Sequence, residues 1–346
     1  MYYQSENPHG GDIYGEPVLL DYSANTNPLG TPPAVIAAAE KALREADRYP
    51  DPYCRALVKA IAAAEGVPES FILCGNGASE LILAFCAALR PRLAASLAPT
   101  FSEYAAAVAL HGGETVFYPL RAEADFRPDE GFLPWLRGLG ADALFLCSPN
   151  NPTGRLLDPA LLGETLKLCR ETGVRILLDE CFLDFTAGES CRERLRAYPN
   201  LTILKAFTKS YGMAGLRLGY CLCADGDLLR SMSERTPPWN VSGPAQAAGT
   251  AALKERTFLE EALALIGRER PRLKAGLEAL GLWVCPSEAN FLLFRGPEDL
   301  GDRLRQRGVA VRNCANFTGL GPGWYRIAVR TEAENSRLLA AMGECV

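Results

Sequence analysis

The chain has 346 residues, of which 48% are hydrophobic and 22% are charged, and these proportions are typical of a globular protein. The net charge of −5 argues against nonspecific binding to nucleic acid. No stretch approaches the roughly 18 uninterrupted apolar residues of a membrane span. No charged start is followed by an apolar run either, so we expect neither membrane insertion nor secretion.

Twelve cysteines could suggest a disulfide framework, but several of them fall inside apolar strands and helices. No two cysteines show Cys-x-x-Cys spacing. We therefore expect reduced thiols in the core of a cytoplasmic protein, and we predict no metal site.

From residue 31 onward, helical periodicity alternates with short apolar runs. The runs that we predict as strands are residues 71–74, 94–98, 115–118, 143–147, 175–179, 202–207 and 218–223. Strands that alternate with helices favour an α/β fold, with a large domain whose mostly parallel seven-stranded sheet is covered by helices. In such sheets, ligands bind beyond the carboxyl ends of the strands.

The pattern breaks near residues 236–238. Helical periodicity resumes from 245 to 280, where we expect Pro271 to interrupt it. An apolar run at 290–295, a helix at 298–307 and short strands at 309–312 and 324–329 follow. We predict a large domain over residues 31–236 and a small α+β domain over residues 237–346.

Lys209 carries the strongest functional signal, because it comes just past an apolar strand, after the hydroxyl of Thr208 and eight residues before Arg217. A lysine that forms a Schiff base needs a partly dry pocket, which lowers its pKa. The hydroxyl and the guanidinium would suit a nearby phosphate. Together these features indicate pyridoxal phosphate (PLP) as the cofactor.

Three other segments fit this cofactor. Asp179 ends an apolar strand, and an aspartate there could keep the ring nitrogen of PLP protonated. Asn151 lies in a turn rich in asparagine and proline, and its amide could reach the phenolic oxygen. The glycine-rich turn 75–80 joins a strand to the apolar helix 78–89, whose N-terminus favours an anion.

The order Gly-Asn-Gly, Asn-Asn-Pro-Thr-Gly, Asp-Glu and Thr-Lys with a trailing Arg resembles the fold-type-I PLP enzymes of the aspartate aminotransferase superfamily, over nearly the whole chain. The resemblance implies that Lys209 binds the cofactor covalently, that Asp179 faces the ring nitrogen and that Phe101 stacks on the ring. It implies Gly77, Ala78, Ser79, Thr208 and Arg217 as residues around the phosphate, with Asn151 at the phenolic oxygen. Ala206 departs from the family, which often has a second hydroxyl there.

The segments outside these cofactor motifs resemble one group of enzymes within the superfamily. His9-Gly10-Gly11, Asp21–Gly30 and Arg48–Asp51 look like the L-threonine-O-3-phosphate decarboxylases of cobalamin biosynthesis, as do segments 238–241, 289–293, 312–317 and 325–330. The related histidinol-phosphate aminotransferases share the core motifs but usually lack the His-Gly-Gly start. They commonly carry a tyrosine where this chain has Phe182, and this difference favours the decarboxylase.

A phosphorylated amino acid carries two anionic groups, so its site needs at least two cations. The decarboxylase resemblance implies Arg312 and Arg326 for these groups. We assign Arg326 to the carboxylate and Arg312, with His9, to the phosphate; the reverse assignment is the alternative. Gly10 belongs to the same N-terminal arm as His9, over the substrate phosphate, and Asn25 is expected near the substrate.

The resemblance also implies a homodimer with shared sites, in which Tyr49 reaches the partner's cofactor phosphate. Residues 1–30 would form an N-terminal arm that joins the small domain and covers the active site. An aminotransferase for a substrate such as histidinol phosphate is the alternative function. A catalytically silent PLP-fold binding module is a second alternative, although both Lys209 and Asp179 are present.

Overall fold

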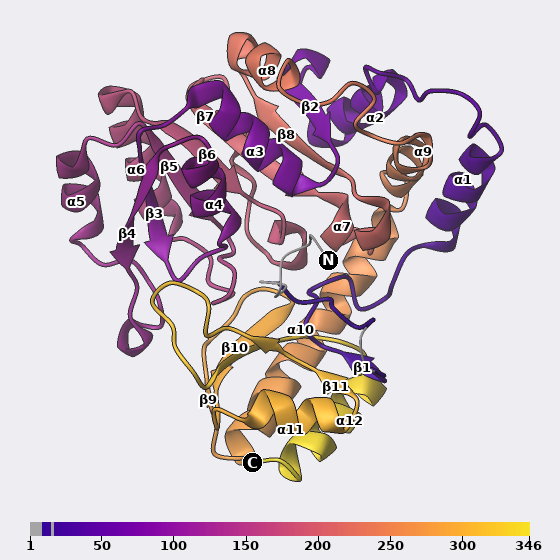
Figure 1. Ribbon diagram of the computed structural model, residues 1–346, viewed down its shortest axis with the longest axis vertical. Helices are drawn as coiled ribbons and strands as arrows, with labels where there is room; N and C mark the ends of the chain where they lie inside the picture. Colours follow the sequence, from indigo (N-terminus) through magenta and orange to yellow (C-terminus); the bar gives the residue numbers. More distant parts are fainter. Residues whose placement is uncertain (1–8, 15–16) are drawn as a thin grey trace.

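The computed structural model describes residues 9–14 and 17–346, except for the side chain of Arg256. In Figure 1, a large sheet with its helices lies above a smaller sheet, and a long helix extends between them. The large sheet has seven strands in the order β2-β8-β7-β6-β5-β3-β4. These strands are β2 (Ile72–Gly75), β3 (Leu93–Ala98), β4 (Glu114–Pro119), β5 (Ala143–Cys147), β6 (Arg175–Asp179), β7 (Leu201–Ala206) and β8 (Gly219–Cys223).

All neighbouring strands of this sheet are parallel except β8, which is antiparallel to both β2 and β7. Its helices are α1 (Pro33–Leu43), α2 (Arg55–Glu65), α3 (Ala78–Leu89), α4 (Glu103–Leu110), α5 (Phe132–Leu139), α6 (Pro159–Thr172), α7 (Phe207–Ser210), α8 (Gly226–Ser233) and α9 (Gly243–Ala252). Short 3₁₀ helices occur at Glu69–Phe71, Ala122–Ala124, Leu183–Phe185, Cys191–Arg194 and Ala214–Leu216. The seven strands and the helix at 78–89 confirm the predicted α/β class.

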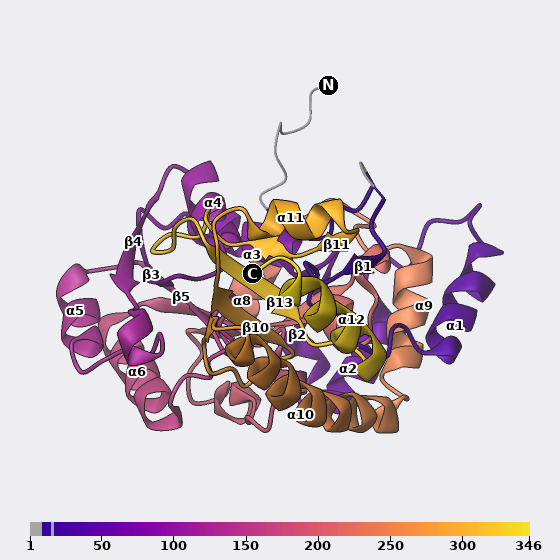
Figure 2. The same ribbon diagram turned by 90° about the horizontal axis from the view of Figure 1, so that it is seen from below.

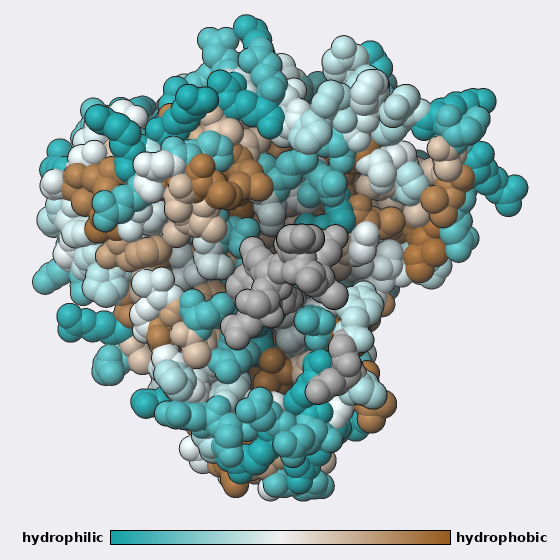
Figure 3. Space-filling view, in the orientation of Figure 1, coloured by the Kyte–Doolittle hydropathy of each residue, from teal (hydrophilic) through white to brown (hydrophobic). Residues whose placement is uncertain are grey.

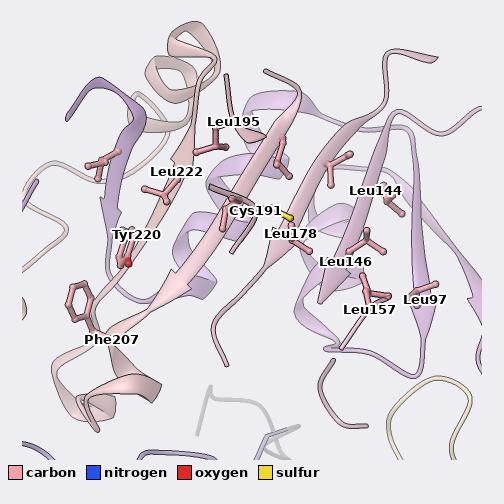
Figure 4. Close-up of a cluster of buried hydrophobic side chains, with 14 of the residues drawn as sticks. Leu97, Leu144, Leu146, Leu157, Leu178, Cys191, Leu195, Phe207, Tyr220 and Leu222 are labelled. Carbon is pink, nitrogen blue, oxygen red and sulfur yellow. The ribbon is translucent and has the colours of Figure 1, made fainter. Parts of the chain in front are cut away.

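Both faces of the large sheet are buried, which explains why its strands read as continuous apolar runs. Along β5, Leu144 and Leu146 point into one hydrophobic cluster, whereas Phe145 and Cys147 point into the other. This alternation follows from the two-residue period of a strand. Figure 4 shows the first cluster, in which leucines of several neighbouring strands pack together.

The small sheet has four antiparallel strands in the order β12-β13-β10-β9. They are β9 (Trp283–Val284), β10 (Phe291–Arg295), β12 (Arg312–Asn313) and β13 (Trp324–Ala328). Its helices are α10 (Arg256–Ala279), α11 (Leu300–Gln306) and α12 (Glu332–Gly343), and Figure 2 shows α10 and α12 close together.

The segment before the large sheet joins this smaller unit. β1 (Leu20–Asp21) pairs in parallel with β11 (Val309–Ala310), and Tyr22 accepts a backbone hydrogen bond from Ala328 at 2.9 Å. Tyr22 is buried in the same hydrophobic cluster as residues of α10 and α12. The part of the predicted arm at residues 1–8 and 15–16 lies outside the described residues. The domain boundary at 236–237 stays a proposal.

Two predictions about this region are wrong. Pro271 lies inside the continuous helix α10 rather than interrupting it. A proline removes one helical hydrogen bond, and the burial of Leu273 and Leu277 beyond it favours continuation of the helix. The expected strand at 309–312 is two strands, because Val309 and Ala310 pair with β1 whereas Arg312 pairs with β13. Within the described ranges, no helix is long and apolar enough to cross a membrane.

Candidate active site

A cavity of about 260 Å³ lies at the carboxyl ends of β5, β6 and β7. The predicted site residues that line it are His9, Gly10, Asn25, Ala78, Ser79, Phe101, Asn151, Asp179, Thr208, Lys209, Arg217, Arg312 and Arg326. Gly77 and Tyr49 do not line it. Ser23, Ala24, Cys147, Cys181 and Phe317 also line the cavity, and the sequence had not singled them out.

Lys209 lies in the short helix α7, which directly follows β7. Burial, followed in effect by the positive charge of Arg326, lowers the pKa of Lys209 to about 8. The backbone of Asn27 donates to the Lys209 carbonyl at 3.1 Å, and the Asn27 side chain donates to the Ser210 carbonyl at 2.8 Å. The backbone at Lys209 is therefore held in place, and its amine loses its proton at a lower pH than an ordinary lysine amine does.

Asp179 ends β6 and is only 5% exposed. Its Oδ1 accepts a hydrogen bond from the backbone N–H of Cys181 at 2.9 Å, and its Oδ2 accepts one from the hydroxyl of Tyr104 at 2.6 Å. Burial raises the pKa of this carboxyl, while the hydrogen bonds act in the opposite direction. A buried carboxylate in this place can hold a proton on a ring nitrogen of a ligand.

The N-terminus of α3 forms one wall of the cavity through Ala78 and Ser79. Gly77 is the N-cap residue, with φ +79°, and a Cβ atom there would lie 2.6 Å from Nη2 of Arg217. The backbone conformation thus favours glycine, and a Cβ atom would also displace the guanidinium of Arg217 from its present place. Backbone N–H groups at a helix N-terminus, an arginine and the nearby Thr208 form a suitable cradle for a phosphate.

Asn151 and Arg326 are joined by a hydrogen bond from Nη1 of Arg326 to Oδ1 of Asn151. Because the amide oxygen is engaged in this way, the NH₂ group of Asn151 is the part left to donate to a ligand. The Phe182 ring centroid lies 5.7 Å from Nζ of Lys209, so a residue without a hydroxyl occupies this side of the lysine. Phe101 offers the cavity an aromatic side chain.

Arg312 and Arg326 bring two positive charges to the cavity, and both are buried, at 8% and 6% exposure. Nη2 of Arg326 donates to the Ser23 carbonyl at 2.9 Å, and Nη2 of Arg312 donates to Oδ1 of Asn316 at 2.7 Å. Asn25 is 2% exposed, and neither polar atom of its side chain has a hydrogen-bond partner within the described residues. A buried amide of this kind favours a polar ligand beside it.

His9 and Gly10 cover one side of the cavity. Nε2 of His9 lies 2.8 Å from Oε1 of Glu103, and its ring centroid is 5.6 Å from that of Phe101. A Cβ atom on Gly10 would lie 2.3 Å from the Ser23 carbonyl oxygen, so only glycine allows this approach. The sequence did not reveal Glu103 as the neighbour of His9.

Tyr49 lies away from this cavity, is 78% exposed and stacks on Trp239 with 4.4 Å between ring centroids. This position leaves its predicted role in a partner's site as a proposal.

The residues of the cavity fit PLP as a set. The N-terminus of α3, with Arg217 and Thr208, suits the phosphate of PLP. Phe101 can stack on the flat ring, and Asn151 can donate to the phenolic oxygen. Asp179 suits the ring nitrogen, and Lys209 suits the aldehyde. Among the residues that the structure describes, both polar side-chain atoms of Asn25 and Nε of Arg326 lack a hydrogen-bond partner, and this favours a polar ligand beside them.

Residues 17–342 match the family of class I and II aminotransferases, and the chain belongs to this family. It is an enzyme of this PLP-dependent family, and PLP is its cofactor. When bound, PLP supplies an electron sink for bond cleavage at the substrate's α-carbon.

The chain is 37% identical to a threonine-phosphate decarboxylase of Salmonella typhimurium, over 96% of this chain and 95% of that protein. It is 36% identical to a histidinol-phosphate aminotransferase of an Anaeromyxobacter species, over 95% of this chain and 92% of that protein. The structure of a histidinol-phosphate aminotransferase from Clostridium acetobutylicum superimposes with a TM-score of 0.88 at 31% identity, covering 94% of this chain and 98% of that one.

Proposed function

We propose that this enzyme decarboxylates L-threonine O-3-phosphate to (R)-1-amino-2-propanol O-2-phosphate in cobalamin biosynthesis. The observation that carries this proposal is the presence of two buried arginines, Arg312 and Arg326, in the same cavity as Lys209. A phosphorylated amino acid has a carboxylate and a phosphate, so each arginine has one anionic group to bind. An aminotransferase would bind these two groups on separate molecules, since histidinol phosphate has a phosphate but no carboxylate and its keto-acid partner has a carboxylate but no phosphate.

In this proposal Arg326 binds the substrate carboxylate, and Arg312 binds the phosphate together with His9. Arg326 is the more deeply placed of the two, since it bonds to Asn151 and lies near Lys209. Arg312 lies against Phe317, with its guanidinium 5.0 Å from the ring centroid. The reverse assignment of the two anionic groups is the alternative.

Substrate orientation decides which reaction a PLP enzyme performs, because the bond perpendicular to the cofactor ring is the one that breaks. A carboxylate held by Arg326 in that direction favours loss of carbon dioxide. Asn25 lines the cavity, and its two polar side-chain atoms have no partner in the described part of the chain, so it is in a position to bind the substrate's remaining polar groups.

Phe182 also favours the decarboxylase over the aminotransferase. Histidinol-phosphate aminotransferases commonly have a tyrosine at this position, where its hydroxyl bonds the phenolic oxygen of the cofactor. Here the side chain beside Lys209 is a phenylalanine, so Asn151 is left to make that contact.

An aminotransferase acting on a phosphorylated amine such as histidinol phosphate is the second candidate, and the 36% identity to such an enzyme favours it. The test is to incubate the enzyme with threonine phosphate in the absence of any keto acid. Release of carbon dioxide supports the decarboxylase. Turnover that depends on added 2-oxoglutarate, without carbon dioxide, would replace it with the aminotransferase.

We also propose a homodimer with shared sites. Exposed apolar side chains support it: Ile36 and Leu43 on α1 are 46% and 59% exposed, and Figure 3 shows hydrophobic residues on the surface where α1 lies. The exposed pair of Tyr49 and Trp239 would lie in or near that interface. A cytoplasmic location is part of the proposal and fits twelve cysteines that are all free and buried.

A further inference from the structure

The hydroxyl of Tyr104 contacts the carboxylate of Asp179. Tyr104 lies in the first turn of α4, is 1% exposed, and donates its hydroxyl to Oδ2 of Asp179 at 2.6 Å. A bond of this length to a carboxylate is a strong, charge-assisted hydrogen bond. The other oxygen, Oδ1, already accepts the backbone N–H of Cys181 at 2.9 Å. Both oxygens of Asp179 therefore have a fixed donor from the protein.

Two aromatic rings fix the position of the tyrosine itself. The ring of Tyr104 stacks on Phe145 of β5, with 5.5 Å between centroids and 16° between planes. Phe101, which also lines the cavity, meets Tyr104 edge to face at 5.6 Å. Since Phe145 is fully buried and Tyr104 itself is 1% exposed, the tyrosine ring cannot move without disturbing the core, and its hydroxyl is held in one place relative to Asp179.

The hydroxyl acts as a donor over the whole working pH range. Burial, together with the negative charge of Asp179, raises the pKa of Tyr104 well above its ordinary value. The other titratable groups that face Asp179 are the thiols of Cys147 and Cys181, whose pKa values burial raises, and the amine of Lys209. The Cys181 thiol and the Tyr104 hydroxyl are thus two neutral donors whose hydrogen bonds lower the pKa of this carboxylate against the effect of burial, and the Tyr104 hydroxyl bonds to Oδ2 at 2.6 Å.

We propose that Tyr104 is a positioning residue for Asp179, which holds the carboxylate in one orientation and limits how strongly it attracts the proton that it shares with the ring nitrogen of the cofactor. A carboxylate that loses a donor becomes more basic. Without the hydroxyl, the shared proton should therefore move from the ring nitrogen toward Asp179. The inference rests on the proposed role of Asp179, but it is independent of whether the enzyme is a decarboxylase or an aminotransferase.

The test is nitrogen NMR of the holoenzyme, loaded with PLP that is ¹⁵N-labelled at its ring nitrogen and measured without substrate. The variants are Tyr104→Phe, which removes only the hydroxyl, and Asp179→Asn. The matched control is Tyr118→Phe, because Tyr118 donates its hydroxyl to Asp129 on the surface, away from the residues of the cavity. Full cofactor loading is checked by absorbance.

For Tyr104→Phe we expect the nitrogen signal to shift toward that of an unprotonated pyridine, and kcat to fall by about tenfold. Tyr118→Phe should keep the signal of the unaltered enzyme. A Tyr104→Phe signal that coincides with that of the unaltered enzyme, while Asp179→Asn shifts it, would overturn the inference. If Asp179→Asn leaves the signal unchanged, the role of Asp179 is wrong and the inference falls with it.

A second variant covers the case in which Tyr104→Phe does not fold. Incorporation of 3,5-difluorotyrosine at position 104 keeps the ring and makes the hydroxyl a stronger donor. The nitrogen signal should then move in the opposite direction, toward full protonation. A purely structural role of Tyr104 predicts no such movement, and its absence in a correctly folded, fully loaded enzyme would contradict the inference.

Discussion

Arg312 and Arg326 lie directly opposite each other on the neighbouring antiparallel strands β12 and β13, and both line the cavity that contains Lys209. Like charges in directly opposed positions of a sheet destabilise it, and burial adds to this cost. Burial lowers the pKa of Arg326 to about 10, and the charge of Arg312 acts in the same direction. An anionic substrate between the two guanidiniums would relieve both costs.

The first prediction concerns how Arg312 recognises the substrate. Arg312→Ala should weaken kcat/KM for threonine phosphate by roughly 2–4 kcal/mol, as expected when one partner of a buried charge pair is removed. The loss should be much smaller for unphosphorylated threonine, which lacks the phosphate. Arg230→Ala, at a surface arginine whose side chain is 73% exposed, is the control. Equal losses on the two substrates would show that Arg312 does not bind the phosphate.

Lys209→Ala should abolish turnover and leave the fold largely intact, because it removes the amine that binds the cofactor covalently. The visible absorbance of bound PLP should be lost as well, while circular dichroism should remain close to that of the unaltered enzyme. Lys59→Ala on α2, where the lysine is exposed, should behave like the unaltered enzyme. A substantial remaining activity in Lys209→Ala would rule out the assignment.

Asp179→Asn should retain PLP but lose most of the activity, since an amide cannot hold a proton on the ring nitrogen. Cofactor retention is measured by absorbance after gel filtration, and activity by the turnover assay. The control is Asp227→Asn, because the side chain of Asp227 is 91% exposed. Near-normal turnover of Asp179→Asn would contradict the proposed role.

The lowered pKa of Lys209 predicts how the rate of cofactor attachment depends on pH. The amine reacts only when it is uncharged, and its pKa in the folded chain is about 8, below the ordinary value of 10.5. The rate at which the apo-protein gains visible absorbance after addition of PLP should therefore rise with pH and level off above about 8. A midpoint near 10.5 would show that the pocket does not lower this pKa.

Shared active sites can be tested by mixing two inactive variants. If Tyr49 serves the partner's cofactor, dimers that combine a Lys209→Ala chain with a Tyr49→Phe chain contain one complete site. Some activity should return on mixing, provided that each parent variant is clearly impaired. Mixed dimers that show no recovery would argue that the sites are not shared in this way.

The sequence by itself determined the large sheet and most of the candidate site. The strands were visible because both faces of the sheet are buried, which makes each strand a continuous apolar run. Asp179 and Lys209 could be placed at one edge because the carboxyl ends of parallel strands share an edge, as the pairing of β6 with β7 shows. The strands and the residues at their ends could be predicted because each depends on a pattern of only a few neighbouring residues.

Only the tertiary structure decided which distant side chains meet. Tyr104 and Asp179 are 75 positions apart, and no local pattern signals their hydrogen bond. The pairing of Arg312 with Arg326 depends on the register of two strands, and the continuity of α10 through Pro271 accompanies buried packing beyond the proline. Such contacts depend on how whole elements pack, because packing can override the local preference of a residue and brings together atoms that the sequence keeps far apart.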